Sequence, residues 1–406
     1  MSETAYLSPN ATLVSDAIST GNIAIQNDLL KNWMYLTPNV ATANTIVAGL
    51  QRYTNTVAQS FWSNIYSPNS YVSINVPNDV GGSTGQGGWS GAVTIPDGRV
   101  LVAPQIPTVT SVGIFNPVTN QFTTVATGTG VGTNYVFAFS GAVSPDGRVI
   151  FCPFRTTAIG IFNPVTNAFT TTTGGLTANP GHAGTCVLPN GQIMFAPYDS
   201  AWIGLFNPAT GVYTTGPSVT GYVANSMAGC VPLPNGNVVL LPQSGTYVGV
   251  YNYITNTVTT TNFSPNLAAN GYFGGGLLPD GTVLLVPFTV QNIGIYNPNT
   301  NSFTKVPISG TGHFGGRLLP NGNFILNPYN STYYGIYDYR TRTYTSVTAS
   351  GALGGGTCQS SGLLADGRVI FPPWVNSSSC NMGVFSGNTV PVDRGFLLSP
   401  LLNHGG

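Results

Sequence analysis

Charged residues are scarce in this chain of 406 residues. Asp, Glu, Lys and Arg together make up 5% of it, against about 25% in an ordinary soluble domain. Eleven basic residues balance eleven acidic ones, and Glu3 is the only glutamate. Because nucleic-acid binding depends largely on neutralising phosphates with Lys and Arg, we expect no nucleic-acid partner. So little charge is typical of a chain that lies in a membrane or is covered by partner proteins.

Long apolar runs are missing as well. Hydrophobic residues make up 42% of the chain, yet Gly, Pro and Asn interrupt every apolar stretch. None of these stretches approaches the roughly 20 residues that cross a bilayer, so we expect no membrane insertion. The first residues, MSETAYLSPN, lack the basic and apolar regions of a secretory signal, which favours assembly in the cytoplasm.

Cysteine is rare and its spacing is irregular. The five cysteines cannot all pair within one chain, and no CxxC motif occurs; they are Cys152, Cys186, Cys230, Cys358 and Cys380. We therefore expect free and mostly buried thiols in a reducing compartment. Within one repeat, Cys358 and Cys380 are the only pair that we consider for a disulfide.

The chain does contain a repeat of roughly 45 residues. Seven copies of one phrase, such as IPDGRVLVAP and LPNGQIMFAP, place Asp-Gly or Asn-Gly between two apolar runs. This is the strongest short-range signal for a β-hairpin, and it predicts a type I′ turn with two residues at positive φ. The turn glycines are Gly98, Gly147, Gly191, Gly236, Gly281, Gly322 and Gly367, separated by 49, 44, 45, 45, 41 and 45 residues.

A second phrase follows six of the hairpins. IFNPVTNQFT and IYNPNTNSFT are examples, and each predicts a third strand, a turn at Asn-Pro-x-Thr-Asn and a fourth strand rich in Thr and aromatics. Four antiparallel strands in each repeat are typical of a propeller blade. The Gly-rich segments before the hairpins fit innermost strands, whose backbones approach one another closely around an axis.

The two ends of the repeat complement each other. The seventh copy stops after NMGVFSG, without a fourth strand, whereas YVSINVPND at Tyr71–Asp79 is a strand without a hairpin before it. We predict that this early strand completes the last blade, which removes exposed sheet edges. The expected fold is all-β: a seven-bladed β-propeller of four-stranded antiparallel blades over residues 71–390, preceded by a helical segment, 1–70, and followed by a tail, 391–406.

The repeat resembles the kelch repeat, in which a strand ending at a turn such as LPDGRV leads to an outer "YDP-T–W" half. IFNPVTNQFT and IYNPNTNSFT look like that outer half, and the resemblance covers about residues 71–388. The sequence departs from the family where its paired glycines are replaced by pairs such as Ala-Pro, and its tryptophan by Phe, Tyr or Val. The resemblance implies the propeller architecture, and we draw no function from it.

Residues 1–70 lack the repeat and carry a helical pattern instead. The apolar residues that recur at helical spacing predict an amphipathic helix; they are Ile46, Leu50, Tyr53, Val57 and Phe61. A shorter apolar helix is expected around Ile25–Met34. Two interpretations remain open, since the helix can pack on the propeller itself or dock into a larger assembly.

Residues for catalysis are few. Asp97, Asp146, Asp280 and Asp366 belong to the hairpin turns, where an Asp-Gly-Arg triplet predicts a solvated ion pair. The remaining aspartates of the repeats are scattered over different blades, which argues against a pair of catalytic carboxylates. We therefore expect no enzyme activity.

One position in the repeat offers candidate metal ligands. Nine residues before the turn glycines stand Trp89, Ala138, His182, Met227, Tyr272, His313 and Cys358, which we expect in a ring at one height near the channel. His182, His313 and Cys358 could ligate copper or zinc, and kelch-like oxidases place copper near such an axis. Equivalent residues of non-adjacent blades lie too far apart for shared ligation, so we predict a structural lining of the channel, without a cofactor.

These observations lead to a non-enzymatic structural or adhesion protein of a virus particle, such as a tail, fibre or capsid-associated protein. The nearly uncharged Thr-, Asn- and Gly-rich composition suits permanent protein contacts, whose cores are depleted in charge. Residues 1–70 would bind other virion proteins, and the propeller would meet a host surface glycan or receptor. The alternatives are a cellular kelch-like interaction or carbohydrate-binding module and, third, a copper oxidase. Tyr333, Tyr334 and Tyr344 either stack on sugars or fill gaps between blades.

Overall fold

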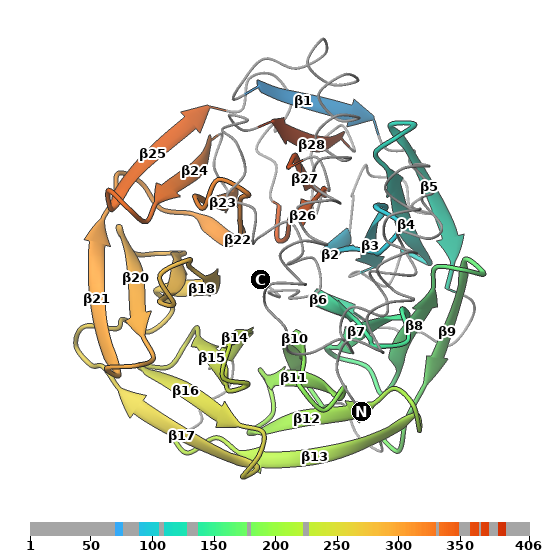
Figure 1. Ribbon diagram of the computed structural model, residues 1–406, viewed down its shortest axis with the longest axis horizontal. Helices are drawn as coiled ribbons and strands as arrows, with labels where there is room; N and C mark the ends of the chain where they lie inside the picture. Colours follow the sequence, from blue (N-terminus) through green and yellow to red (C-terminus); the bar gives the residue numbers. More distant parts are fainter. Residues whose placement is uncertain are drawn as a thin grey trace, which may run out of the picture.

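A computed structural model shows that the chain folds into a ring of seven β-sheets around an axis (Figure 1). It describes residues 70–75, 89–104, 109–127, 137–176, 180–221, 227–329, 333–348, 358–364, 367–372 and 381–386. Each sheet has four antiparallel strands, as predicted for a seven-bladed propeller. The helices predicted within 1–69 lie outside the described residues. No helix in the described part is long and apolar enough to span a membrane.

The blades follow one another in chain order. Blade 1 consists of β2 (Trp89–Thr94), β3 (Val100–Pro104), β4 (Ser111–Asn116) and β5 (Gln121–Ala126). Blade 2 consists of β6 (Phe137–Val143), β7 (Val149–Pro153), β8 (Ile159–Asn163) and β9 (Ala168–Thr172). Blade 3 consists of β10 (His182–Val187), β11 (Ile193–Pro197), β12 (Trp202–Asn207) and β13 (Val212–Ser218). Blades 4 and 5 consist of β14 (Met227–Pro232), β15 (Val238–Pro242), β16 (Tyr247–Asn252), β17 (Thr257–Asn262); β18 (Tyr272–Leu277), β19 (Val283–Pro287), β20 (Asn292–Asn297) and β21 (Ser302–Pro307). Blade 6 consists of β22 (His313–Leu318), β23 (Phe324–Pro328), β24 (Tyr333–Asp338) and β25 (Thr343–Thr348). The first strand of each blade lies innermost and the fourth lies at the rim (Figure 1).

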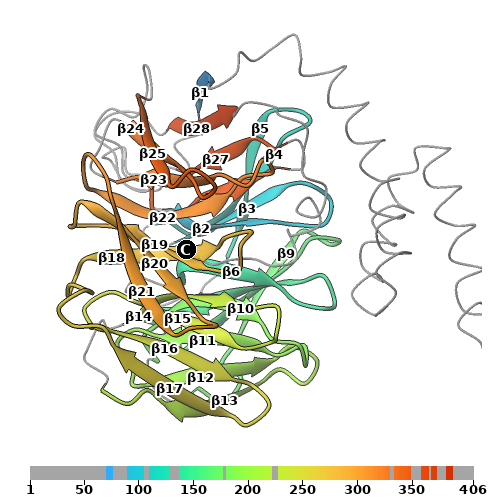
Figure 2. The same ribbon diagram turned by 60° about the vertical axis from the view of Figure 1, so that its left-hand side comes forward.

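Blade 7 joins the two ends of the repeat. Its strands are β26 (Gly362–Leu363), β27 (Val369–Phe371), β28 (Asn381–Ser386) and, outermost, β1 (Ser70–Asn75). In β1, which lies beside β28 (Figure 2), Tyr71 pairs with Phe385 and Ile74 with Met382. The predicted closure of the ring by the early strand is therefore confirmed, and the strand begins one residue earlier than expected.

The hairpin turns differ from the predicted type. Only the glycine has positive φ, +87° at Gly98, whereas Asp97 does not. The amide of Gly98 donates to the carbonyl of Ile95, and the amide of Ile95 donates to the carbonyl of Arg99, both at 2.9 Å. This is a type I turn followed by a bulge with a left-handed glycine, the geometry of the next longer hairpin loop. The type I′ prediction was wrong because the residue before the glycine keeps a negative φ.

Arginines of these turns join neighbouring blades. Arg99 pairs with Asp97 at 2.6 Å, as the predicted ion pair requires. Its guanidinium also donates to the carbonyl of Pro164 at 2.8 Å and to Asn167 at 2.7 Å, both in the third-to-fourth-strand turn of the next blade. Arg148 repeats the arrangement on Pro208 at 2.7 Å. The triplet therefore links successive blades as well as forming an ion pair.

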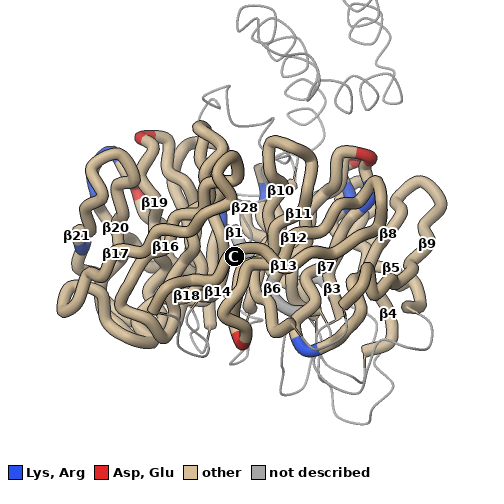
Figure 3. Tube along the Cα trace, turned by 90° about the horizontal axis from the view of Figure 1, so that it is seen from below, with Lys and Arg blue, Asp and Glu red and all other residues tan. Residues whose placement is uncertain are grey.

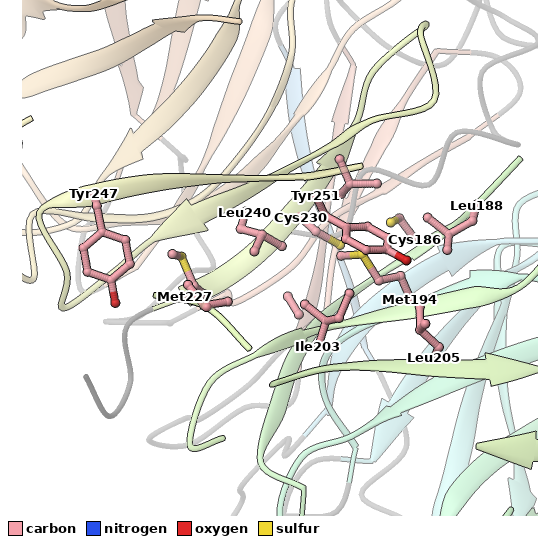
Figure 4. Close-up of a cluster of buried hydrophobic side chains, with 13 residues drawn as sticks. Cys186, Leu188, Met194, Ile203, Leu205, Met227, Cys230, Leu240, Tyr247 and Tyr251 are labelled. Atoms are coloured by element: carbon pink, nitrogen blue, oxygen red, sulfur yellow. The ribbon is translucent and has the colours of Figure 1, made fainter. Parts of the chain in front are cut away.

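Packing between blades supplies the core. The second strands, such as β11 and β15, are buried along their whole length, whereas outermost strands such as β13 have no buried residue and expose threonines. Between blades 3 and 4, Cys186 and Met194 pack against Cys230 and Leu240 (Figure 4). Cys152, Cys186, Cys230 and Cys358 are free and buried, as expected. Cys380 lies outside the described residues, so its pairing with Cys358 stays a prediction.

Candidate functional site

Two of the candidate metal ligands, His182 and His313, point away from the channel. His182 begins the innermost strand β10, and its Nε2 lies 2.8 Å from the hydroxyl oxygen of Tyr213 on the outermost strand β13. His313 makes the same contact, also 2.8 Å, with Tyr344 on β25. Both histidines are fully buried, at 0% exposure. Their side chains therefore cross the blade, and the predicted ring of channel-lining side chains is wrong at these positions.

A glycine in the third strand makes room for this crossing. A Cβ atom on Gly204 would lie 2.6 Å from the Nε2 of His182 and 2.7 Å from the Tyr213 ring. In blade 1, a Cβ atom on Gly113 would collide with the ring of Phe122, and the centroid of that ring lies 5.2 Å from that of Trp89. In each of these blades the first residue of the innermost strand thus meets the aromatic residue of the fourth strand, over the glycine of the third strand. This repeated contact fills the blade interior.

Blade 2 contains one additional residue in this region. Phe137 pairs with Pro153 and Gly141 with Phe151, whereas the corresponding pairs of blade 3 begin at His182 and Thr185. Phe137 therefore takes the position that the spacing had assigned to Ala138. Its ring lies 5.8 Å from that of Phe169 on β9.

The environment of both histidines favours the neutral form. Burial lowers the pKa of His182 to about 3 and that of His313 to about 4. Burial also raises the pKa of the Cys358 thiol to about 12. The described residues include no group of three His, Cys, Asp or Glu side chains placed to hold a metal ion. His182, His313 and Cys358 belong to blades 3, 6 and 7, and the structure does not bring them together.

Aromatic side chains gather instead at the centre of one face, which we call the aromatic face. They come from two places in the repeat: the second residue of the innermost strand and the residue after the proline that ends the second strand. Its members are Phe154, Tyr198, Phe273, Phe288, Phe314 and Tyr329, together with Ala183 and Ala228. Since this proline lies at the opposite end of the second strand from the hairpin turn, the aromatic face lies opposite the hairpins.

Four of the rings, those of Phe273, Phe288, Phe314 and Tyr329, form a continuous contact network. Phe273 and Phe314 stack with centroids 3.5 Å apart, and Tyr329 stacks on Phe314 at 5.1 Å. Phe288 meets both phenylalanines edge-on, at 6.2 and 6.0 Å. Phe273 and Phe314 are only 3% and 4% exposed, whereas Phe288 and Tyr329 are partly exposed. The buried pair therefore forms a floor from which the other rings rise to the surface.

Polar side chains are fixed close to residues of the aromatic face. Arg155 lies 3.0 Å from the carboxylate of Asp199, and its guanidinium lies 4.9 Å from the centre of the Phe154 ring. Nearby, the Ser244 hydroxyl donates to the Asn270 side chain at 2.9 Å, and the Thr289 hydroxyl donates to the Asn270 carbonyl at 2.7 Å. An apolar floor with a few fixed polar groups is the usual make-up of a ligand site.

The sequence carries a signal for this face at a position just beyond the hairpin phrase. The residue after the second-strand proline reads Gln105, Phe154, Tyr198, Gln243, Phe288, Tyr329 and Trp374, and thus is aromatic in five of seven repeats. Gln105 and Trp374 lie outside the described residues. Of the tyrosines considered for sugar stacking, Tyr334 is fully buried and Tyr344 bonds His313, so both fill the blades.

Comparisons with known proteins identify the fold. No protein-family model matches the sequence, and no curated protein is detectably similar to it. Among solved structures, a streptogramin B lyase matches 78% of this chain over 96% of its own, with 15% identity and a TM-score of 0.64. An inactive virginiamycin B lyase from Staphylococcus aureus, with quinupristin, covers 78% and 99%, with 13% identity and a TM-score of 0.63. A fungal alcohol oxidase in complex with copper covers 79% and 77%, with 11% identity and a TM-score of 0.60. At such identities the similarity shows that this chain has a β-propeller fold.

Proposed function

We propose that this protein is a non-enzymatic adhesion protein whose propeller is a rigid platform and whose aromatic face binds a glycan. The observation that carries the proposal is the cluster of rings at the centre of one face, partly exposed and bordered by Arg155, Asp199 and Asn270. A sugar ring has an apolar face of C–H groups, which packs on an aromatic ring, and hydroxyl groups, which bond carboxylates, amides and guanidinium groups.

The platform character follows from how the reactive side chains are used. His182 and His313 are buried and bonded to tyrosines, and they are held neutral by burial. Asp97 and Asp146 are paired with arginines of their own turns. These groups serve the packing of the blades, which supports a binding role over a catalytic one.

Attachment to a virus particle is the finer part of the proposal. Acidic and basic positions are few along the trace of the described propeller (Figure 3). Low charge suits permanent contacts with other subunits. In this scheme, residues 1–70, including Ile46, Leu50, Tyr53, Val57 and Phe61, bind other virion proteins; of this segment the structure describes only Ser70. Co-sedimentation of the full chain with particles, and capsid or tail genes beside its own, would support this location, whereas a cellular kelch-like module would show neither.

Glycan-array binding of the full-length protein tests the recognition step. Alanine at Phe288 or Tyr329 should weaken binding about tenfold, since a ring covered by the ligand buries apolar surface worth roughly 1.5–3 kcal/mol. The matched control is Val165→Ala, an exposed apolar residue in a turn on the hairpin side. The proposal fails if the array shows no glycan binding, or if both aromatic variants, folded as judged by their melting midpoints, bind as tightly as Val165→Ala. Stoichiometric copper in the purified full chain would instead favour the oxidase alternative.

A further inference from the structure

One large aromatic side chain is exposed on the side of the propeller that carries the aromatic face. Trp202 is 49% exposed and begins β12, at the end of that strand opposite the hairpins. The other large apolar side chains that are exposed in the described part of the chain are aliphatic: Val118, Val165, Val212 and Ile254. They lie in or beside the turns between third and fourth strands, which the hairpin arginines contact. Trp202 is therefore set apart from them both in chemistry and in place.

The alternation along β12 places Trp202 on the side of its sheet that faces blade 2. Successive side chains of a strand point to opposite sides. Ile203 and Leu205 pack in the cluster between blades 3 and 4, whereas Phe206 packs with residues of blade 2 such as Ile150. The extra residue of the irregular pairing at this end lies in β13, so the alternation along β12 is undisturbed. Trp202 therefore shares its side of the sheet with Phe206.

An ion pair joins blades 2 and 3 at the same boundary. Asp199 precedes Trp202 by three residues, and its carboxylate lies 3.0 Å from the Nε of Arg155 in blade 2. The two side chains are 32% and 41% exposed, so a solute can reach both. Ser200 makes two hydrogen bonds with the backbone of Trp202, at 3.2 and 3.3 Å, which fix the segment between Asp199 and the tryptophan. The boundary thus offers polar groups without a net charge.

These residues form a strip that leads outward from the centre of the aromatic face. At its inner end the rings of Phe154 and Tyr198 meet edge-on, with centroids 5.3 Å apart. Arg155 and Asp199 are the next residues along the chain. Trp202 follows at the start of the third strand, which lies farther from the axis than the second (Figure 1). Aromatic rings therefore occur at both ends of the strip, and the polar pair belongs to the segments that connect them.

The length of the strip suits more than one sugar. The innermost and third strands of a blade lie about 10 Å apart, which is two strand spacings. One sugar ring on the floor of the aromatic face therefore does not reach Trp202, whereas a short oligosaccharide does. Its sugar rings have apolar faces that pack on aromatic rings, and their hydroxyl groups bond guanidinium and carboxylate groups.

We propose that Trp202 and the Arg155–Asp199 pair form an outer subsite, so that the aromatic face binds an uncharged oligosaccharide with one end over Trp202. This inference rests on the proposed glycan binding and adds the length and the charge of the ligand. An uncharged sugar fits because the ion pair leaves no net charge at the subsite to attract an acidic or basic group.

Titration of the full-length protein with two ligands tests the subsite: the neutral oligosaccharide that binds most tightly on the glycan array, and its constituent monosaccharide. Trp202→Ala should weaken binding of the oligosaccharide about tenfold, because an aromatic ring covered by the ligand is lost, and leave binding of the monosaccharide unchanged. Trp202→Phe keeps a ring and should retain most of the affinity. Val212→Ala is the matched control, since Val212 is 48% exposed in the same blade but lies at the hairpin end.

The outcomes separate this inference from the proposed function. If Trp202→Ala binds the oligosaccharide as tightly as Val212→Ala does, or loses affinity for both ligands equally, Trp202 forms no outer subsite, whereas glycan binding by the wild type still stands. Binding of acidic glycans alone would also overturn the inference and leave glycan binding in place. A wild type that binds no glycan would overturn the proposed function and the inference together.

Discussion

Single residues hold each blade together through one contact that crosses it. His182 and His313 show this most clearly, because each lies on an innermost strand and bonds a tyrosine of the outermost strand. Trp89 and Phe122 make the apolar version of the same contact. The histidine is therefore one of several side chains that fit this position, and its chemistry in the fold is that of a buried neutral hydrogen-bonding ring.

This role predicts a loss of stability in mild acid. The pKa values of His182 and His313 are about 3 and 4 in the folded protein, below the roughly 6.5 of an unfolded chain. The unfolded state therefore binds protons first, and the stabilisation is complete above pH 6.5 and falls as the pH drops toward 4. Between pH 7.5 and 5.5 the free energy of unfolding should fall by about 1.4 kcal/mol for each histidine, as measured by urea unfolding.

Variants assign this pH dependence to the two positions. His182→Gln and His313→Gln should each remove about half of the fall between the two pH values. If the wild type were equally stable at both, or if neither variant changed the dependence, the histidines would not be held neutral in the way that the structure indicates.

The residue scale also shows what sequence reasoning could reach. The turn glycines were identified correctly because a left-handed residue in a hairpin is specified locally. The direction of the His182 side chain was not predicted correctly. The pairing of β10 with β11 shifts between His182 and Thr185, and a bulge of this kind leaves no mark in the spacing of motifs. The position of Phe137 was missed for a similar reason, since its blade has one more residue there.

At the scale of elements, the ring depends on one strand contributed from far away in the sequence. β1 pairs with β28 across all six of its residues, from Ser70↔Ser386 to Asn75↔Asn381. This pairing was predictable because an incomplete last repeat and an isolated early strand complement each other. The hydrogen bonds of Arg99 to the next blade were not predictable, because they form only when the turn of that blade lies beside the hairpin.

Prolines in β1 should open the ring. The double variant Val72→Pro/Ser73→Pro removes the amide hydrogens of two adjacent residues. Adjacent amides face opposite sides of a strand, so at least one of the two can no longer donate to β28. We expect the free energy of unfolding to fall by about 3 kcal/mol, because the ladder bonds of β1 and the closure are lost together. Thr345→Pro/Ser346→Pro is the matched control, since β25 is also an outermost strand but closes only its own blade. A loss in the β1 variant no larger than in this control would argue against closure by β1.

At the scale of the whole molecule, the ring brings together residues that are about 45 positions apart. Phe154, Tyr198, Phe288 and Tyr329 each belong to a different blade, and they meet only because the blades surround an axis. The sequence repeat predicts the blades but not which of their loops become neighbours on a face. This is why the fold could be predicted almost completely, whereas the candidate site became visible only in three dimensions.

The most direct test of the account is hydrogen exchange of the full-length protein with and without an oligosaccharide selected on the glycan array. Bound glycan should slow exchange in segments that are distant in sequence but share the aromatic face: 152–156, 197–200, 242–245, 270–273 and 287–290. Exchange in the hairpin turn 95–99 and in the rim strands β5 and β9 should not change. Protection of the hairpin turns or the rim, with none on the aromatic face, would contradict the account.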